Sequence, residues 1–169
     1  MTQNNLIEIL DIVPSSINDH EQSLWGFNIE SPKQGTQTAT NKVWFVGWVL
    51  GKNASAVAVD VISSGTVIYR ITFNQSRGDV AEIYPDVPGV ENCGFATEVL
   101  LSELPEEAEL ILQAVFSDIS SVPLAVVRVG RRPPRWKQIQ TDLERSRTRL
   151  QQIQAELARS QSRLDKVQK

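Results

Sequence analysis

Residues 42–73 read KVWFVGWVLGKNASAVAVDVISSGTVIYRITF, a stretch made almost entirely of β-branched, aromatic and small residues. The first run, 42–50, is apolar on both faces of an extended chain, which is typical of a buried strand. The runs at 56–62 and 67–74 are separated by Ser-Ser-Gly-Thr, so together they predict a β-hairpin. The last run alternates, which predicts a half-buried strand. Its apolar members are Val67, Tyr69, Ile71 and Phe73.

Four further runs of the same kind lie on either side of this stretch. They are LWGFNIE at 24–30, GFATEVLL at 94–101, ELILQAVF at 109–116 and PLAVVRV at 123–129. Seven short strands joined by Gly, Pro, Ser and Asn, without helical periodicity between them, predict an antiparallel immunoglobulin-like β-sandwich over residues 22–130. The fold class is therefore mainly β. We expect its core to contain Trp44, Phe45, Trp48, Tyr69, Phe73, Phe95 and Phe116.

The two ends of this domain differ in character. Residues 1–21 are acidic, with an apolar run before Pro14, and are interpreted as a short or flexible leader that forms a helix, a strand or a frayed end. Residues 131–135 are rich in Arg and Pro. Proline donates no ladder hydrogen bond but is tolerated in the first turn of a helix. We therefore expect 131–135 to be a linker between the sandwich and a helix.

Residues 136–169 carry an unbroken heptad pattern without Gly or Pro. Such a narrow apolar stripe is typical of a coiled coil, so we expect a helix about 50 Å long whose function is association. The predicted interface comprises Trp136, Ile139, Leu143, Leu150, Ile153, Leu157, Leu164 and Val167. The partner is either another copy, giving a homo-oligomer, or a helix of a different protein.

The predicted coiled coil is weak. Ser146 and Ser160 occupy two d positions, and a 14-residue unit that starts at Leu143 is repeated from Leu157. Asp142 at g can pair with Arg147 at e in a parallel dimer, whereas the other g residues face glutamine. The sequence predicts a marginal, concentration-dependent, parallel assembly.

Charge is divided unevenly along the chain. Residues 1–127 contain 5 Lys and Arg against 16 Asp and Glu, and residues 128–169 contain 12 against 4. The favoured interpretation of the basic tail is a solvated helix surface, with a peripheral membrane surface or an acidic partner as alternatives. Nucleic acid is not expected as a partner, and neither is a membrane span, since no window approaches 18 apolar residues.

Catalytic chemistry is not expected. Cys93 and His20 are the only cysteine and histidine, and no third residue is spaced to orient them. The chain also lacks GxGxxG, P-loop, HExxH and GxSxG motifs, so we expect no cofactor. Without a disulfide framework or a recognisable secretion signal, the expected location is cytoplasmic.

Aromatic residues give the candidate ligand-binding positions Trp25, Trp44, Trp48 and Tyr84. Trp44 and Trp48 share one face of their strand. Core packing is the favoured interpretation for these two, with stacking on a sugar ring as the alternative. Trp25 and Tyr84 have polar neighbours and are the better candidates for exposure.

Acidic residues cluster in the long connection after the predicted hairpin. Asp79, Glu82 and Asp86, with Glu91 further along, are candidate ligands for a hard cation such as Ca²⁺. The favoured interpretation is structural: residues 77–84 form a helical turn, Tyr84 and Val87 close the open end of the sandwich, and prolines fix the crossover. Contact with a glycan or a protein is a third interpretation.

Residues 27–130 resemble the N-terminal β-sandwich module of certain bacterial cell-surface glycosyltransferases, sulfotransferases and methyltransferases. The resemblance is carried by RGDVAEIYPDVPG at 77–89, with IESP at 29–32, VGWVLG at 46–51 and CGF at 93–95. The tail is similar to the coiled coils that often follow this module. The resemblance implies a non-catalytic accessory module of glycan-modifying enzymes, and no catalytic residue is implied because a transferase domain is not present in the sequence.

Overall fold

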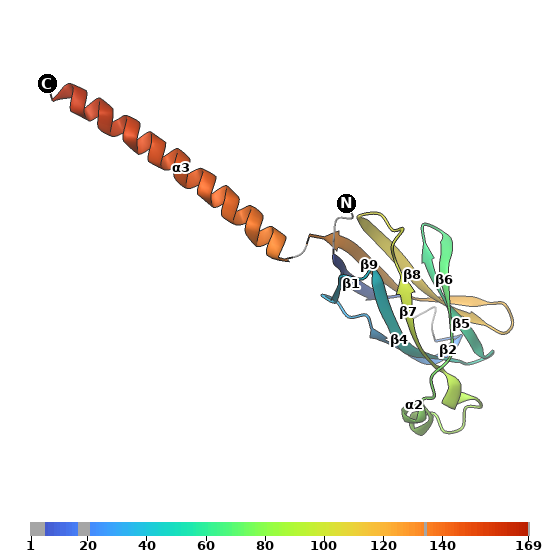
Figure 1. Ribbon diagram of the computed structural model, residues 1–169. Coiled ribbons are helices and arrows are strands. Elements are labelled where there is room, and N and C mark those ends of the chain that lie inside the picture. The colour runs from blue at the N-terminus through green and yellow to red at the C-terminus, as the bar shows by residue number, and fades with distance from the viewer. Residues whose placement is uncertain (1–5, 17–20, 134, 169) are drawn as a thin grey trace. The chain divides into compact units, whose positions relative to one another are not determined.

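The computed structural model describes residues 6–16, 21–133 and 135–168 (Figure 1). The described chain is mainly β, with two antiparallel sheets and one long C-terminal helix. The elements are β1 Leu6–Pro14, β2 Leu24–Ser31, β3 Gln37–Thr38, β4 Lys42–Gly51, β5 Ala56–Ser63, β6 Thr66–Thr72, helix α2 Gly78–Ile83, 3-10 helix η1 Val90–Asn92, β7 Gly94–Leu100, β8 Glu107–Phe116, β9 Ser121–Arg132 and helix α3 Arg135–Val167. The seven predicted strands and the helical turn near 77–84 are all present.

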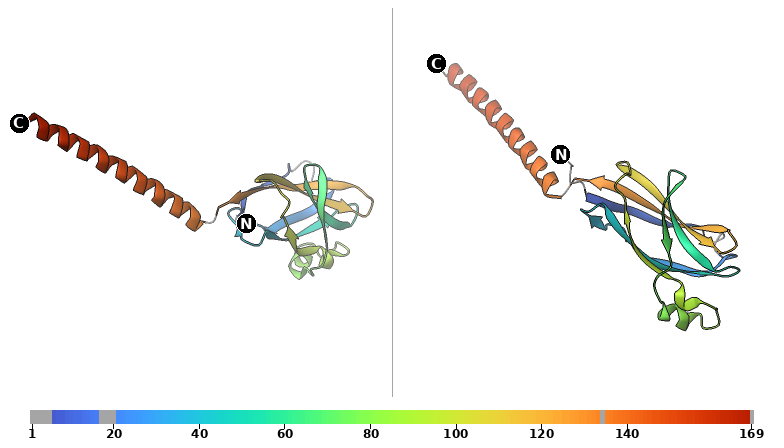
Figure 2. Two further views of the ribbon diagram at one scale, coloured as in Figure 1. Left: turned by 45° about the horizontal axis from the view of Figure 1, so that its top comes forward. Right: turned by 45° about the vertical axis from the view of Figure 1, so that its right-hand side comes forward.

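The larger sheet has six strands in the order β3-β1-β9-β8-β5-β6, and the smaller has β2-β4-β7. All pairings are antiparallel, and β5 and β6 form the predicted hairpin. Its turn places Ser64 at φ 50° and Gly65 at φ 78°, the left-handed conformations that a two-residue hairpin loop requires. Figure 2 shows the sheets as stacked layers, with β1 in dark blue beside β9 in orange.

Of the helix, strand and frayed end considered for residues 1–21, the structure has a strand over Leu6–Pro14, and this strand is part of the β domain. This segment is strand β1, which pairs with β9 from Leu6↔Arg132 to Pro14↔Ala125. Ile7 and Ile9 are each 1% exposed and belong to the main core. Because burial of two isoleucines contributes roughly 3 to 6 kcal/mol, the strand is held by packing as well as by its ladder. Among the three interpretations offered for the segment, the strand is confirmed for its described part.

The main core lies between the two sheets. Strand β4 alternates, and its residues Val43, Phe45 and Val49 belong to this core together with Phe95 of the neighbouring β7 and residues of the larger sheet. Phe116 is also buried, and Phe73 packs against the core from its margin. For Trp44 the prediction of core packing is wrong, because it lies on the opposite face of β4 and is 54% exposed.

Strand β6 is exposed, in contrast to the half-buried strand that its alternation predicts. Only Ile71 is buried, while Val67 and Tyr69 are 47% and 40% exposed. The reason is strand order: β6 is the edge of the larger sheet, and its register with β5 shifts at Val61/Ile62. Tyr69 is therefore not a core residue.

A second, smaller core lies where the connection from β6 to β7 folds over the smaller sheet. Its buried members are Leu50, Val80, Val90 and Cys93, and Trp48, Ala81, Tyr84 and Val87 pack against them. Leu50 and Trp48 belong to the face of β4 that points away from the main core. The α2–η1 connection, shown in green at the foot of Figure 1, thus covers part of that face.

The chain divides into two compact units, and the first ends at Arg132. The predicted linker began at residue 131, but Arg131 and Arg132 are the last residues of β9. The Arg131 guanidinium donates hydrogen bonds to the Leu101 and Ser102 carbonyls at 3.1 and 2.6 Å, which ties the end of β9 to the β7–β8 loop. Helix α3 belongs to the second unit.

Candidate functional site

The predicted helix interface lies along α3, a helix of 33 residues. We call its eight large apolar residues the heptad stripe: Trp136, Ile139, Leu143, Leu150, Ile153, Leu157, Leu164 and Val167. All are exposed, from 47% for Ile153 to 83% for Val167. Threonines elsewhere on the helix bond to the preceding turn, as Thr148 does to the Glu144 carbonyl at 3.0 Å. Large apolar side chains aligned on one face present a surface whose burial against another helix is favourable.

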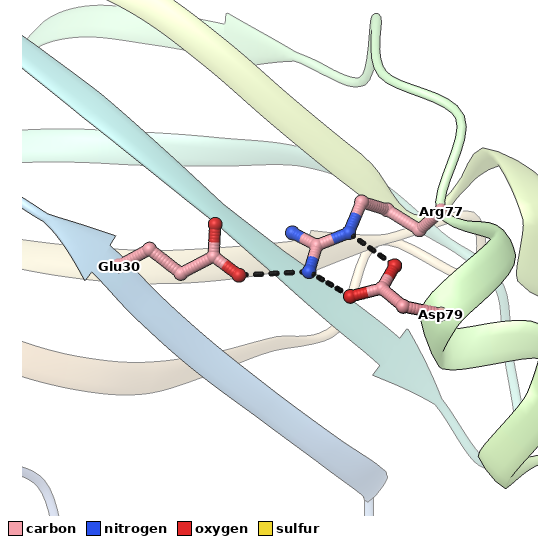
Figure 3. Close-up of polar contacts among 3 residues, drawn as sticks. All are labelled: Glu30, Arg77 and Asp79. Atoms are coloured by element: carbon pink, nitrogen blue, oxygen red, sulfur yellow. Dashed lines mark hydrogen bonds and ion pairs between the residues drawn. The ribbon is translucent and has the colours of Figure 1, made fainter.

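Arg77 links the α2–η1 connection to the smaller sheet (Figure 3). Its guanidinium donates two hydrogen bonds to the Asp79 carboxylate, at 2.8 and 2.5 Å, and a third to Glu30 of β2 at 2.7 Å. The Arg77 side chain is only 14% exposed. Its stem lies over Gly94, where a Cβ atom would approach Arg77 Cγ to 2.6 Å. Glycine at 94 is therefore required for this placement.

The ion pairs of Arg77 shift its own pKa and that of Asp79, and both shifts favour the charged forms. Hydrogen bonds from Arg77 lower the pKa of Asp79 from 3.8 to about 2, and the bonds to Asp79 and Glu30 raise the pKa of Arg77. Arg77 and Glu30 were not among the predicted site residues. The sequence contains one signal that could have identified Arg77 as an ion-pair residue. It is one of two arginines before residue 128, and it stands among several carboxylates.

Three of the four predicted aromatic residues are brought together at one end of the smaller sheet. The rings of Trp48 and Tyr84 lie 6.2 Å apart between centroids, inclined at 57°, and the Tyr84 hydroxyl donates to the Trp25 carbonyl at 3.2 Å. A Cβ atom at Gly26 would lie 3.0 Å from both Trp48 and Tyr84. Trp48 and Tyr84 are partly buried in the second core, whereas Trp25 is 45% exposed.

Trp25 forms one wall of a hollow of about 260 Å³, which is otherwise lined by residues 51–55 and 86–88. The Lys52 ammonium stands 4.9 Å from the centroid of the Trp25 ring. Asn53 is fixed by a hydrogen bond from its side-chain amide to the Gln22 carbonyl at 3.1 Å. An exposed indole beside a charged and an amide side chain combines a stacking surface with polar groups, a combination suited to a polar ring.

Trp44 does not join this group. It lies near the start of β4 opposite Glu98, does not line the hollow, and its backbone carbonyl accepts a hydrogen bond from the Ser31 hydroxyl. Since it is 54% exposed, its side chain is available to solvent.

The candidate cation ligands are not gathered into one site. Asp79 is engaged by Arg77, and Asp86 lies at the hollow beside Trp25. Within residues 6–16, 21–133 and 135–168, no three His, Cys, Asp or Glu side chains are placed to hold a metal ion.

Cys93 is 5% exposed in the second core, and this burial raises the pKa of its thiol. His20, the other residue considered for nucleophilic chemistry, lies outside the described residues. Cys93 therefore packs as a small apolar residue of the second core.

Among the helices that the structure describes, no segment combines the length and the apolar character that a membrane span requires. Comparison of the chain with protein-family models, with curated proteins and with solved structures gives no match.

Proposed function

We propose that this protein is a non-catalytic interaction module in which α3 pairs with α3 of a second copy as a coiled coil. The observation that carries the proposal is the heptad stripe, whose eight side chains are each between 47% and 83% exposed on an uninterrupted 33-residue helix. Each large apolar side chain that such pairing buries contributes roughly 1.5 to 3 kcal/mol before the entropic cost of association.

The consequence of pairing is bivalency. Two β domains held on one coil would bind a repetitive partner with an effective concentration in the millimolar range, even if each domain binds weakly. The serines at positions 146 and 160 lower the apolar content of the seam. We therefore expect assembly to depend on protein concentration.

A seam variant and a matched surface variant test the proposal. Leu150→Asp places a charge in the middle of the stripe, whereas Thr148→Asp places the same charge at position f, on the outside of a coiled coil. By light scattering at several hundred micromolar, we expect the native chain and Thr148→Asp to exceed the chain mass of 18.9 kDa and Leu150→Asp to have that mass. Equal masses for all three proteins would contradict the proposal.

We further propose that the β domain, from β1 to β9, is an immunoglobulin-like sandwich that serves as an accessory module to glycan-modifying enzymes. The support is the resemblance of RGDVAEIYPDVPG and its companion motifs to modules of bacterial glycosyltransferases. The chain also passes repeatedly between its two sheets, from β4 to β5 and again from β6 to β7, as Greek-key sandwiches do.

A second candidate function is carbohydrate binding, favoured by the position of Trp25 on the hollow near Lys52, Asn53 and Asp86. Sugar rings stack on exposed indoles and bond to polar groups beside them. Titration with bacterial oligosaccharides, followed by tryptophan fluorescence and iodide quenching, tests this. Trp25→Ala should abolish the response and Trp44→Ala, a similarly exposed control, should retain it. If no oligosaccharide alters the fluorescence or its quenching, this function is wrong.

A further inference from the structure

The charged residues along one flank of the heptad stripe alternate in sign. In the heptad that begins with Trp136 at a, the g positions are Asp142, Arg149, Glu156 and Arg163, and all four are exposed. In coiled coils, the residues at e and g determine which helices pair and in which orientation. We propose that α3 pairs with α3 of a second copy in the antiparallel orientation, in the single register that aligns the whole stripe. This inference rests on the self-association proposed above.

Full overlap of the stripe defines that register. In an antiparallel pair, each a residue packs beside a d residue of the other helix. Trp136 then meets Val167 of the second copy, Ile139 meets Leu164, and Leu150 meets Ile153 at the centre. Both serines meet leucines: Ser146 faces Leu157, and Ser160 faces Leu143. Every position of the stripe is therefore covered.

The same register brings opposite charges together along the flank. In antiparallel coils, g residues face g residues. Asp142 then faces Arg163 of the second copy, and Arg149 faces Glu156. Two-fold symmetry repeats both contacts, so the dimer has four opposite-charge pairs and no like-charge pair among these positions. Within its own helix, Asp142 has only a 4.0 Å contact with Arg145, so its carboxylate is free to make the intermolecular pair.

If the antiparallel pair is shifted by one heptad, every g residue that has a partner faces a residue of like charge. In one direction Asp142 meets Glu156 and Arg149 meets its own copy. In the other direction Arg149 meets Arg163 and Glu156 meets its own copy. Like charges in these positions are destabilising. The order of charges therefore favours the full-overlap register and opposes its nearest competitors.

The parallel orientation, which we expected from Asp142 and Arg147 alone, has less to favour it. Its remaining g residues, Arg149, Glu156 and Arg163, face the glutamines at 154, 161 and 168. In a parallel pair, Ser146 would also face Ser146 of the second copy and Ser160 would face Ser160, which gives two polar layers in the seam. The antiparallel pair has mixed serine–leucine layers instead, and because a buried hydroxyl without a hydrogen bond is costly, the preference for this orientation comes from the charged flank.

Charge exchange tests the predicted contacts. Arg149→Glu or Glu156→Arg alone creates two like-charge contacts in the antiparallel dimer, so each should weaken association about tenfold. The double variant restores opposite charges and should return the dissociation constant to about twofold of the native value. In a parallel dimer both positions face glutamine, so unchanged association in the single variants, or no rescue in the double variant, would overturn the inference.

Spin labels report orientation directly. In a Cys93→Ala background, one variant carries Ser162→Cys and another Ala155→Cys, both at outward f positions. An antiparallel pair separates the two labels along the axis by about 30 Å at 162 and by about 10 Å at 155, whereas a parallel pair gives no axial separation at either. The expected result of electron–electron distance measurement is a much longer distance at 162.

The possible outcomes distinguish the two proposals. Equal distances at 162 and 155 in a dimeric protein would overturn the antiparallel inference and leave self-association standing. Monomeric mass with no dipolar coupling at either position would overturn both.

Discussion

At the scale of single residues, Arg77 determines how the α2–η1 connection is held. Its guanidinium joins Glu30 of β2 to Asp79 of α2, and its backbone N–H donates to the Glu91 carbonyl at 2.7 Å. Lysine could not reproduce this arrangement, because a single ammonium lacks the planar set of donors that reaches two carboxylates at once.

We expect Arg77→Met to lower the free energy of unfolding by about 2 kcal/mol, since Glu30 would lose its bonded cation and the connection its anchor. Urea denaturation measures this. Arg128→Met is the matched control, because the ion pair of Arg128 with Glu109 is exposed and long, at 3.6 Å. Its loss should change stability by less than about 0.5 kcal/mol. Similar losses in the two variants would contradict the role assigned to Arg77.

The lowered pKa of Asp79 makes its contribution dependent on pH. Its pKa in the folded state is about 2, below the ordinary 3.8, so the stabilisation is present above pH 3.8 and is lost as pH falls towards 2. We expect Asp79→Asn to be less stable than the native protein at pH 7, and the difference to disappear between pH 4 and pH 2. A difference that does not vary with pH over this range would show that the Arg77–Asp79 pair is not its source.

The tryptophans show which residue environments the sequence could predict. Phe45 and Phe95 were expected in the core and are buried there, because large apolar residues on the inner face of a sheet are stabilised by packing against the opposite sheet. Trp44 and Trp48 share the other face of β4, and their different burial depends on the α2–η1 connection, which covers Trp48 but not Trp44. That distinction depends on tertiary contacts between segments far apart in the chain.

At the scale of elements, the strands between Leu24 and Val129 were predictable because their β-branched and aromatic runs are bounded by turn residues. Strand β1 was only one of three options for its segment, because its ladder partner β9 lies more than a hundred residues away in the sequence. The exposed position of β6 also depends on strand order, which a local pattern does not contain. Helix α3 was predictable because its periodicity is local.

Within α3, the serines at d explain the expected weakness of the assembly. Ser160→Leu adds a large apolar side chain to each helix of a pair, and each contributes roughly 1.5 kcal/mol or more on burial. We expect the variant to dimerise at a concentration at least tenfold lower than the native chain. Ser162→Leu, at an outward f position, should leave the dissociation constant nearly unchanged. Equal effects of the two substitutions would indicate non-specific adhesion rather than a seam.

At the scale of the whole molecule, the β domain and α3 belong to separate compact units. The β domain has two cores, and all eight side chains of the heptad stripe on α3 are exposed. In the antiparallel dimer, the two β domains would lie at opposite ends of a coil about 50 Å long, a geometry suited to bridging two sites on one partner.

The central claim is that the heptad stripe pairs copies of this chain, and sedimentation equilibrium over a dilution series tests it most directly. We expect the weight-average mass to approach twice 18.9 kDa at high concentration and to fall towards 18.9 kDa on dilution, because the seam is marginal. A mass of 18.9 kDa at every concentration up to several hundred micromolar would contradict the claim.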